Sequence, residues 1–345
     1  GSVNIDMIAA AAPNSLNQLR VQSEGYDLCV IDLDDLTARK EEENTTASLL
    51  RGECEAFRQR GAKLSGLDVY ISSNVPKGSG VSSSAAFEVL VGVILNDCFM
   101  AEKVSPIAIA QIGQWAENVY FGKPCGLMDQ TACAVGKVIT IDFKEVGHPV
   151  VREVPFDLAA KGFALCISDT KGSHADLTDD YAAVRREMES VAEFFGKKVL
   201  RDVDEETFLK AIPEVRKVTG DRAVVRAIHF YNDSRRAGEI YEAIKADDFD
   251  RFLQLIIEGG HSSFEFNQNA YSIKNPQEQG VPLALAISQN VLNGRGAWRL
   301  QGGGFAGTIQ AFVPLALLET YKNAIDAVFG AGSCHVLSVR NYGAV

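Results

Sequence analysis

The sequence predicts an α+β protein with two domains. The chain has 345 residues, of which 46% are hydrophobic and 23% charged, so it has ordinary globular composition and enough length for two domains. Its first half mixes strand-like segments with helices, whereas long polar-faced helices follow Asp176. A doubly wound parallel sheet is disfavoured because strands and helices do not alternate regularly. We place the boundary where the type of element changes, which predicts domains 1–160 and 161–345.

The first domain is expected to begin with strands and to continue with helices. Apolar or alternating runs predict strands over residues 3–12, 18–23, 28–33, 67–72 and 138–143. Helical periodicity predicts helices over residues 46–60, 85–100 and 105–120. The last of these has Ser105 as a plausible N-cap and Pro106 at its first position. Residues 121–136 show no clear period at their start.

The second domain is expected to be mainly helical. Helices are predicted over residues 179–195, 204–211, 224–246, 249–258 and 316–329. Strands are predicted over residues 163–168, 308–313 and 334–339, with a glycine-rich turn before the second of them. No internal repeat or low-complexity linker separates the two halves. The boundary therefore depends only on the change in element type.

Composition and charge disfavour several classes of function. A formal net charge of -11 and an isoelectric point near 5.1 would repel a phosphate backbone, so no nucleic acid partner is expected. The apolar run 87–100 is interrupted by Glu88, Asn96 and Asp97 and is too short for a bilayer span, so no membrane segment is expected. No leader pattern opens the chain and the seven cysteines form no CxxC pair, which favours a reducing cytoplasm. No protein partner is evident.

Residues 76–86, PKGSGVSSSAA, predict a phosphate-binding loop. They lie between a predicted strand and a predicted helix, so backbone N–H groups and the helix dipole can converge on an anion. The glycines let the backbone approach a phosphate closely, and the serines offer hydroxyls to a phosphate or a metal ion. The loop is not a Walker A motif, because it has no Gly-Lys-Ser/Thr triplet at the required spacing. The alternative is a flexible turn in which Ser84 caps the helix.

Residues 122–130, GKPCGLMDQ, place one acid, Asp129, among small and apolar neighbours. Burying a charge is costly, so a carboxylate in such surroundings is expected to have a specific role. Asp129 could be a general base, or it could orient a hydroxyl that attacks a phosphorus atom. The alternative is an ordinary cap for a helix that begins near Thr131.

Residues 299–308, RLQGGGFAGT, contain three consecutive glycines and a fourth glycine two residues after Phe305. A second site at which only the backbone contacts a ligand would have this composition. A tight turn packed against a neighbouring segment would have it as well.

The three segments, in this order and at these separations, resemble the GHMP small-molecule kinases and, within them, the galactokinase subfamily. The resemblance covers most of the chain. Residues 76–86 resemble the nucleotide-binding motif, GLMDQ the segment with the catalytic aspartate, and residues 299–308 the third, glycine-rich motif. Residues 180–187, DYAAVRRE, are similar to a tyrosine and paired-arginine region near the sugar.

This resemblance implies a two-domain fold with a mixed sheet and helices in each domain and an active site in the cleft between them. It also implies transfer of the γ-phosphate of ATP to the anomeric hydroxyl of galactose or a related sugar, with Mg²⁺ as a cofactor. ATP and the sugar are thus the expected partners. Catalysis would come mainly from positioning and electrostatic stabilisation.

Matched position by position, the resemblance implies a catalytic role for Asp129, a place beside the sugar for Gly126 and a sugar contact for Tyr181. Mg²⁺ would be held by Ser83 and Glu117, although Glu117 could instead be a solvated carboxylate on a helix face. The nucleotide would be bound by Lys77, Gly78, Ser79, Gly80, Val81, Ser82, Ser83 and Ser84. The phosphates and the sugar would lie near Gly302, Gly303, Gly304 and Gly307.

Two departures from the family pattern bear on activity. Galactokinases begin with an arginine-led segment that contains a Glu-His-Thr-Asp string, and we expect this segment to precede Gly1 in the whole protein. If it were absent, the protein could be a catalytically silent sugar or nucleotide sensor. The second departure is the string NPQEQG at residues 275–280, which is either a loop and helix start or an altered substrate wall. An altered wall would suit a kinase for a different small molecule.

Overall fold

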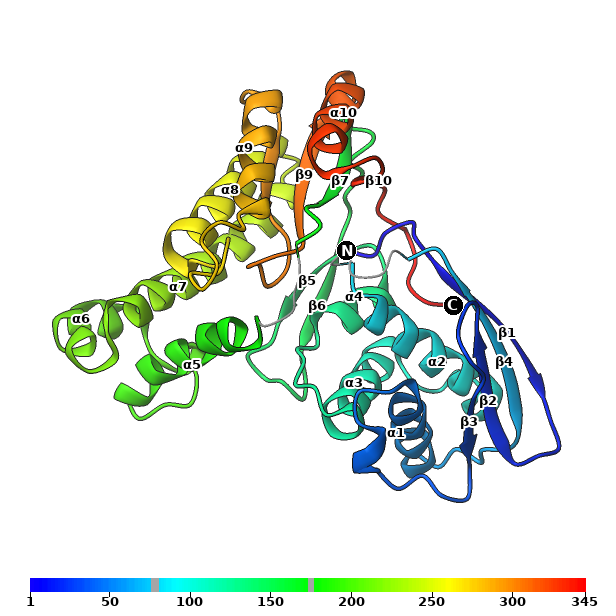
Figure 1. Ribbon diagram of the computed structural model, residues 1–345. Helices are drawn as coiled ribbons and strands as arrows, with labels where there is room; N and C mark the ends of the chain where they lie inside the picture. The colour runs from blue at the N-terminus through cyan, green and yellow to red at the C-terminus, as the bar shows by residue number, and fades with distance from the viewer. Residues whose placement is uncertain (76–80, 173–176) are drawn as a thin grey trace. The chain divides into compact units, whose positions relative to one another are not determined.

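The computed structural model describes residues 1–75, 81–172 and 177–345, which form two compact units (Figure 1). Unit 1 comprises Gly1–Ile141 and Val339–Val345, and unit 2 comprises Asp142–Ser338. The division differs from the predicted boundary at residue 160 because the chain leaves unit 1 earlier and then returns to it. The return is made by a β-bridge between Val3 and Val339 and by a hydrogen bond from Lys137 N to Arg340 O.

Unit 1 contains a four-stranded mixed sheet. Its order is β1 (Met7–Pro13), β4 (Leu67–Ser73), β2 (Gln18–Ser23) and β3 (Cys29–Asp32). β2 and β4 run parallel, whereas the other neighbours are antiparallel. Alternation along the strands buries one face, with Leu19, Val21 and Ile71 each 2% exposed. The helices of unit 1 lie on one side of this sheet (Figure 1).

The helices of unit 1 include the one that follows the predicted phosphate-binding loop and the one that contains Asp129. They are η1 (Lys40–Glu42), α1 (Thr46–Gln59), α2 (Ser83–Met100), α3 (Pro106–Ala116), η2 (Glu117–Phe121) and α4 (Met128–Val135). Ser105 Oγ accepts a hydrogen bond from Ala108 N at 3.3 Å, which confirms the predicted cap of α3. The last turn of the predicted helix 105–120 is a separate π-helix, η2. A separate two-stranded sheet pairs β5 (Val138–Asp142) with β6 (Val150–Val154). The first segment of unit 1 ends within β5, at Ile141.

Unit 2 contains a four-stranded sheet that is antiparallel throughout. Its order is β10 (Cys334–Leu337), β7 (Phe163–Asp169), β9 (Thr308–Pro314) and β8 (Ala297–Leu300). Helices cover both of its faces. Ala297 and Phe312 pack on one side against a cluster that includes Leu255, whereas Ala311 and Val313 pack on the other against Tyr321.

The helices of unit 2 confirm the predicted helical character of this part of the chain. They are α5 (Thr178–Phe194), η3 (Leu200–Asp202), α6 (Glu205–Thr219), α7 (Asp221–Lys245), α8 (Phe249–Ser262), η4 (Ser263–Asn267), α9 (Gly280–Leu292), η5 (Leu315–Leu317) and α10 (Leu318–Phe329). A separate core joins α5, α6 and α7 through Val191, Phe208 and Ala227, each of which is 0% exposed.

One helix in the described part of the chain, α2, is long and apolar enough to cross a membrane. It begins at Ser83, two residues before the predicted helix 85–100, and so reaches 18 residues. A helix in the core of a globular unit meets the same criterion, and one such helix is weak evidence. Glu88 lies on α2 and is fully buried.

Candidate active site

A pocket of about 740 Å³ opens beside the start of α2 in unit 1. Its walls come from the sheet, from α1 and from the first two turns of α2, and they include Ser83, Ser84, Tyr26, Leu49 and Phe87. The pocket has both apolar and polar lining residues, as small-molecule sites do. Four of the predicted nucleotide-binding residues lie outside the described residues, namely Lys77, Gly78, Ser79 and Gly80. The remaining four are at or next to the pocket.

The helix α2 begins at Ser83, directly after the predicted loop. Ser82 occupies the N-cap position in a left-handed conformation with φ 57°, and its side chain makes no capping hydrogen bond. Ser84 lies within the first turn, so the interpretation of Ser84 as the cap is wrong. Because the first N–H groups of a helix have no intrahelical acceptor, the start of α2 keeps free donors and the positive end of its dipole.

Asp129 meets the end of the predicted phosphate-binding loop. Ser82 Oγ donates a hydrogen bond to Asp129 Oδ2. Asp129 lies in the first turn of α4, which begins at Met128 and has Leu127 at its N-cap position. The alternative, that Asp129 caps a helix near Thr131, is therefore wrong. Two of the three predicted motifs thus come together within unit 1.

The surroundings of Asp129 are partly open. Gly126 is exposed, and a Cβ at this position would have no heavy atom within 4 Å. Burial, and then the negative charge of Asp129, raise the pKa of the Cys133 thiol to about 11. Cys133 is therefore protonated at neutral pH and is not a reactive thiolate.

Glu117 is buried beside a second acid and an amide. Glu117, Glu88 and Gln130 are 4%, 0% and 2% exposed. Gln130 Nε2 donates to Glu88 Oε2 at 2.9 Å and to Glu117 Oε2 at 3.3 Å. The other oxygen of Glu117, Oε1, lies 3.7 Å from Lys123 Nζ. The interpretation of Glu117 as a solvated carboxylate on a helix face is therefore wrong.

Burial also changes the ionisation of Glu88. Its removal from water, and then the charge of Glu117, raise the pKa of Glu88 to about 8. Burial likewise raises the pKa of Glu53 on α1, which is fully buried. With a pKa of about 8, the Glu88 carboxyl is therefore mainly protonated at neutral pH.

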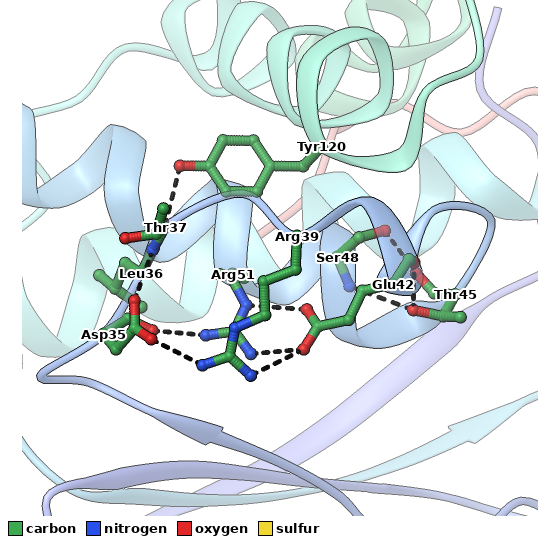
Figure 2. A network of polar contacts seen from close by, with 9 residues as sticks. All are labelled: Asp35, Leu36, Thr37, Arg39, Glu42, Thr45, Ser48, Arg51 and Tyr120. Carbon is green, nitrogen blue, oxygen red and sulfur yellow. Dashed lines mark hydrogen bonds and ion pairs between the residues drawn. The ribbon is translucent and has the colours of Figure 1, made fainter.

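The π-helix that carries Glu117 is fastened to the loop between β3 and α1 (Figure 2). Tyr120 Oη donates to Leu36 O at 2.9 Å, and Asn44 N donates to Phe121 O at 3.0 Å. The loop itself is held by Arg51, which is 3% exposed. Arg51 Nε and Nη2 donate to the two carboxylate oxygens of Glu42 at 2.8 Å each. This network fixes the backbone on which Glu117 is mounted.

The third predicted motif lies in unit 2, between β8 and β9, and is packed tightly. Tyr181 Oη donates to Gly304 O at 2.8 Å, and a Cβ at Gly303 would lie 2.8 Å from Tyr181 Cε1. Gly302, Gly304 and Gly307 have φ values of 67°, 82° and 86°, which favour glycine. The turn is thus packed against a neighbouring segment, as one of the two interpretations expected. Its predicted contacts with phosphates and sugar remain predictions.

Comparison with known proteins decides the family. Residues 48–137 match the family described as GHMP kinases N terminal domain. A galactokinase of Streptomyces coelicolor is 30% identical over 329 residues, which are 94% of this chain and 81% of that protein. This chain belongs to the GHMP kinase family. It is a phosphotransferase with an alcohol group as acceptor, and its similarity to galactokinases makes it a sugar kinase.

Solved structures of other GHMP kinases share the fold. The crystal structure of Lactococcus lactis galactokinase complexed with galactose has a TM-score of 0.80 and 22% identity, covering 99% of this chain and 87% of that one. L. major mevalonate kinase in complex with R-mevalonate has a TM-score of 0.62 and 14% identity, with coverage of 99% and 87%. The predicted two-domain α+β fold of GHMP kinases is therefore confirmed.

The donor groups of this GHMP kinase suit a magnesium ion. The described residues contain no group of three or more His, Cys, Asp or Glu side chains that could hold a metal. Mg²⁺ does not need one, because it is usually bound by one or two carboxylates together with substrate phosphates. Glu117 offers a buried carboxylate and Ser83 a hydroxyl at the start of α2. These are hard oxygen donors of the kind that Mg²⁺ prefers.

Two residues of this site were not singled out from the sequence. Glu88 interrupts an apolar helix, which was a signal for a buried acid, and Gln130 directly follows Asp129. Their connection could not be predicted, because Glu88, Glu117 and Gln130 come from α2, η2 and α4. Only the packing of these elements brings the three side chains together.

The string at residues 275–280 has two roles in unit 2. It is a loop and helix start, since α9 begins at Gly280. It also lines a pocket of about 900 Å³ through Asn275, Gln277 and Gln279, together with Phe305 and Ala306 of the third motif. The loop and helix start is therefore confirmed, whereas the altered substrate wall remains a prediction.

Proposed function

We propose that this GHMP kinase transfers the γ-phosphate of ATP to the anomeric hydroxyl of galactose or a closely related hexose. The observation that carries the proposal is the hydrogen bond from Ser82 to Asp129. It joins the end of the predicted nucleotide loop to the predicted catalytic carboxylate, which phosphoryl transfer requires to lie near the phosphates. The similarity to galactokinases supports the choice of sugar.

The nucleotide is proposed to bind in the pocket beside α2. Tyr26, Leu49 and Phe87 offer apolar surface for a base, and Ser83 and Ser84 line the same pocket. The phosphates would lie at the start of α2, where unpaired N–H groups and the helix dipole favour an anion. Val81 and Ser82, together with residues 77–80, complete the proposed loop.

Asp129 is proposed to act on the attacking sugar hydroxyl. A carboxylate within hydrogen-bonding distance of this hydroxyl either accepts its proton or orients it toward the phosphorus atom. Ser82 would hold the carboxylate in place before the sugar binds. Gly126, which leaves open space next to the same segment, would lie beside the sugar.

Ser83 and Glu117 are proposed to hold the magnesium ion. Mg²⁺ would neutralise charge on the β- and γ-phosphates. Glu117 suits this role because it is a buried carboxylate whose Oε2 atom accepts from Gln130 and whose Oε1 atom already lies 3.7 Å from a cation, Lys123 Nζ.

Tyr181 and the glycine turn are proposed to contribute from unit 2. Gly303 and Gly304 hold the ring and the hydroxyl of Tyr181, so its orientation is fixed. Its hydroxyl oxygen can still accept a hydrogen bond from a sugar hydroxyl. The phosphates and the sugar are proposed to lie near Gly302, Gly303, Gly304 and Gly307, of which Gly302 and Gly303 are exposed. We also propose a cytoplasmic location, since all seven cysteines are free thiols.

The test of this proposal is the variant Asp129→Asn, which keeps the shape of the side chain and removes its charge. We expect sugar-dependent ADP release to fall by about 10²- to 10⁴-fold, the range for a general base. ATP binding, measured by calorimetry, should be unchanged. Full activity in this variant would show that Asp129 is not the catalytic carboxylate.

A further inference from the structure

Gln130 forms a buried bridge between two carboxyl groups. Its amide nitrogen lies 2.9 Å from Glu88 Oε2 and 3.3 Å from Glu117 Oε2. One amide nitrogen carries two hydrogens, so both bonds can exist at once. All three side chains are at most 4% exposed, which removes competition from water. Water therefore does not compete with the hydrogen bond by which Gln130 restrains Glu117.

The bridge leaves polar atoms without partners. Gln130 Oε1 and Glu88 Oε1 are buried and have no hydrogen-bond partner among the described residues. Leaving a buried polar atom without a hydrogen bond costs free energy, so an apolar cluster of the same volume would fill this space at a lower cost. A polar cluster retained at such a cost suggests that it serves more than packing.

The neighbouring backbone is shaped to admit the bridge. A Cβ at Gly113 on α3 would lie 2.9 Å from Glu88 Cβ and 3.0 Å from Glu88 Oε2. Only glycine lets α3 approach this closely. On the other side, Tyr120 and Phe121 tie the π-helix of Glu117 to the loop before α1 (Figure 2). Glu117 is thus held both through its side chain and through the backbone of its helix.

The two oxygens of Glu117 have different surroundings. Oε2 accepts from Gln130 at 3.3 Å, whereas Oε1 forms an ion pair with Lys123 Nζ at 3.7 Å, beyond hydrogen-bonding distance. The Lys123 side chain is 63% exposed, so it is not fixed by burial. Restraint of one oxygen leaves the other as the atom available to a cation.

We propose that Gln130 is a positioning residue that orients Glu117 toward the magnesium ion of the bound nucleotide, with Glu88 as the anchor of the amide. This inference rests on the proposed function, in which Glu117 is a ligand of that ion. Gln130 itself contacts neither the sugar nor the nucleotide. Loss of such an outer contact typically weakens metal affinity about 10- to 100-fold.

The test measures Mn²⁺ binding to the complex of the whole protein with ADP, by electron paramagnetic resonance, in the variant Gln130→Met. We expect Mn²⁺ affinity to fall by about tenfold or more and the Mg²⁺ concentration needed for half-maximal activity to rise, with KM for the sugar unchanged. Thr131→Val is the matched control, because Thr131 is buried in the same helix and its hydroxyl donates to a backbone oxygen, Leu127 O, at 2.7 Å. This control should bind Mn²⁺ like the wild type.

The outcomes separate the positioning role from the metal assignment. If Gln130→Met folds and binds Mn²⁺ with wild-type affinity, the positioning role is wrong, while the proposed function stands. Gln130→Asn shortens the amide and provides the same comparison if the methionine variant does not fold. If Glu117→Gln keeps wild-type Mn²⁺ affinity, the metal assignment itself fails and this inference fails with it.

Discussion

Glu88 is a carboxylic acid that folding removes from water completely. Its pKa rises from the ordinary value of 4.5 to about 8, first through burial and then through the charge of Glu117. The unfolded chain thus releases this proton near pH 4.5, whereas the folded protein holds it until about pH 8. The stability that Glu88 contributes is full below the lower value and is lost as the pH rises through the higher one.

This ionisation predicts a stability loss at alkaline pH that the variant Glu88→Gln should largely avoid. Between about pH 5.5 and 8.5, the free energy of unfolding should fall more in the wild type than in the variant, by about 2–4 kcal/mol. Urea titrations of both proteins at the two pH values measure the difference. An identical pH dependence in both proteins would mean that Glu88 titrates normally.

Two arginines in the loop network provide a second comparison between residues (Figure 2). Arg51 is buried and makes a two-bond contact with Glu42, whereas the Arg39 side chain is 37% exposed. Replacing Arg51 leaves the partly buried carboxylate of Glu42 with fewer partners. We therefore expect Arg51→Met to lower the free energy of unfolding by about 2–3 kcal/mol. Arg39→Met should cost less than about 1 kcal/mol, as exposed ion pairs do. Equal losses in thermal unfolding would contradict the role of burial.

At the scale of elements, helix packing in unit 1 depends on a glycine, because a residue without a side chain lets two helices approach closely. A Cβ at Gly52 on α1 would lie 2.9 Å from Tyr120 Cγ and 3.0 Å from Ala116 Cβ. Gly52 therefore sets the distance from α1 to the end of α3 and to η2. Gly238 on α7 is the matched case, because a Cβ there would meet nothing within 4 Å.

The two glycines predict opposite effects of the same substitution. Gly52→Ala should destabilise the protein by about 1–3 kcal/mol, because it overpacks the contact with Tyr120. Gly238→Ala should be neutral or stabilising by up to about 1 kcal/mol, since alanine favours the helix. Denaturant unfolding of both variants measures this. If both changes were stabilising, the close contact at Gly52 would not be real.

Elements with strong local signals could be predicted from the sequence, and weaker ones could not. The start of α3 follows from Ser105 and Pro106, and β2 follows from its alternation. The strand β6 is short and mostly exposed, so it has no apolar face to reveal it. The helix α4 begins at Met128, and Leu127 at its N-cap position makes no side-chain cap, which removes the usual start signal.

At the scale of the whole molecule, the return of the last residues to unit 1 had no signal in the sequence. Val339–Val345 belong to unit 1 through pairing with Val3 and Lys137, contacts that only the folded chain creates. The same limit applies to the site. Asp129 could be singled out by its apolar neighbours, but its bond to Ser82 and the burial of Glu117 depend on how α2, η2 and α4 pack.

The central claim is that the protein is an ATP-dependent sugar kinase that uses galactose or a close relative. The most direct test measures ADP release from ATP and Mg²⁺ by the whole protein, as its gene encodes it, with a panel of monosaccharides. We expect galactose or a close relative to support release, with phosphorus NMR showing phosphate on the anomeric oxygen. Absence of ADP release with every monosaccharide would contradict the claim and would favour a sensor without catalytic activity.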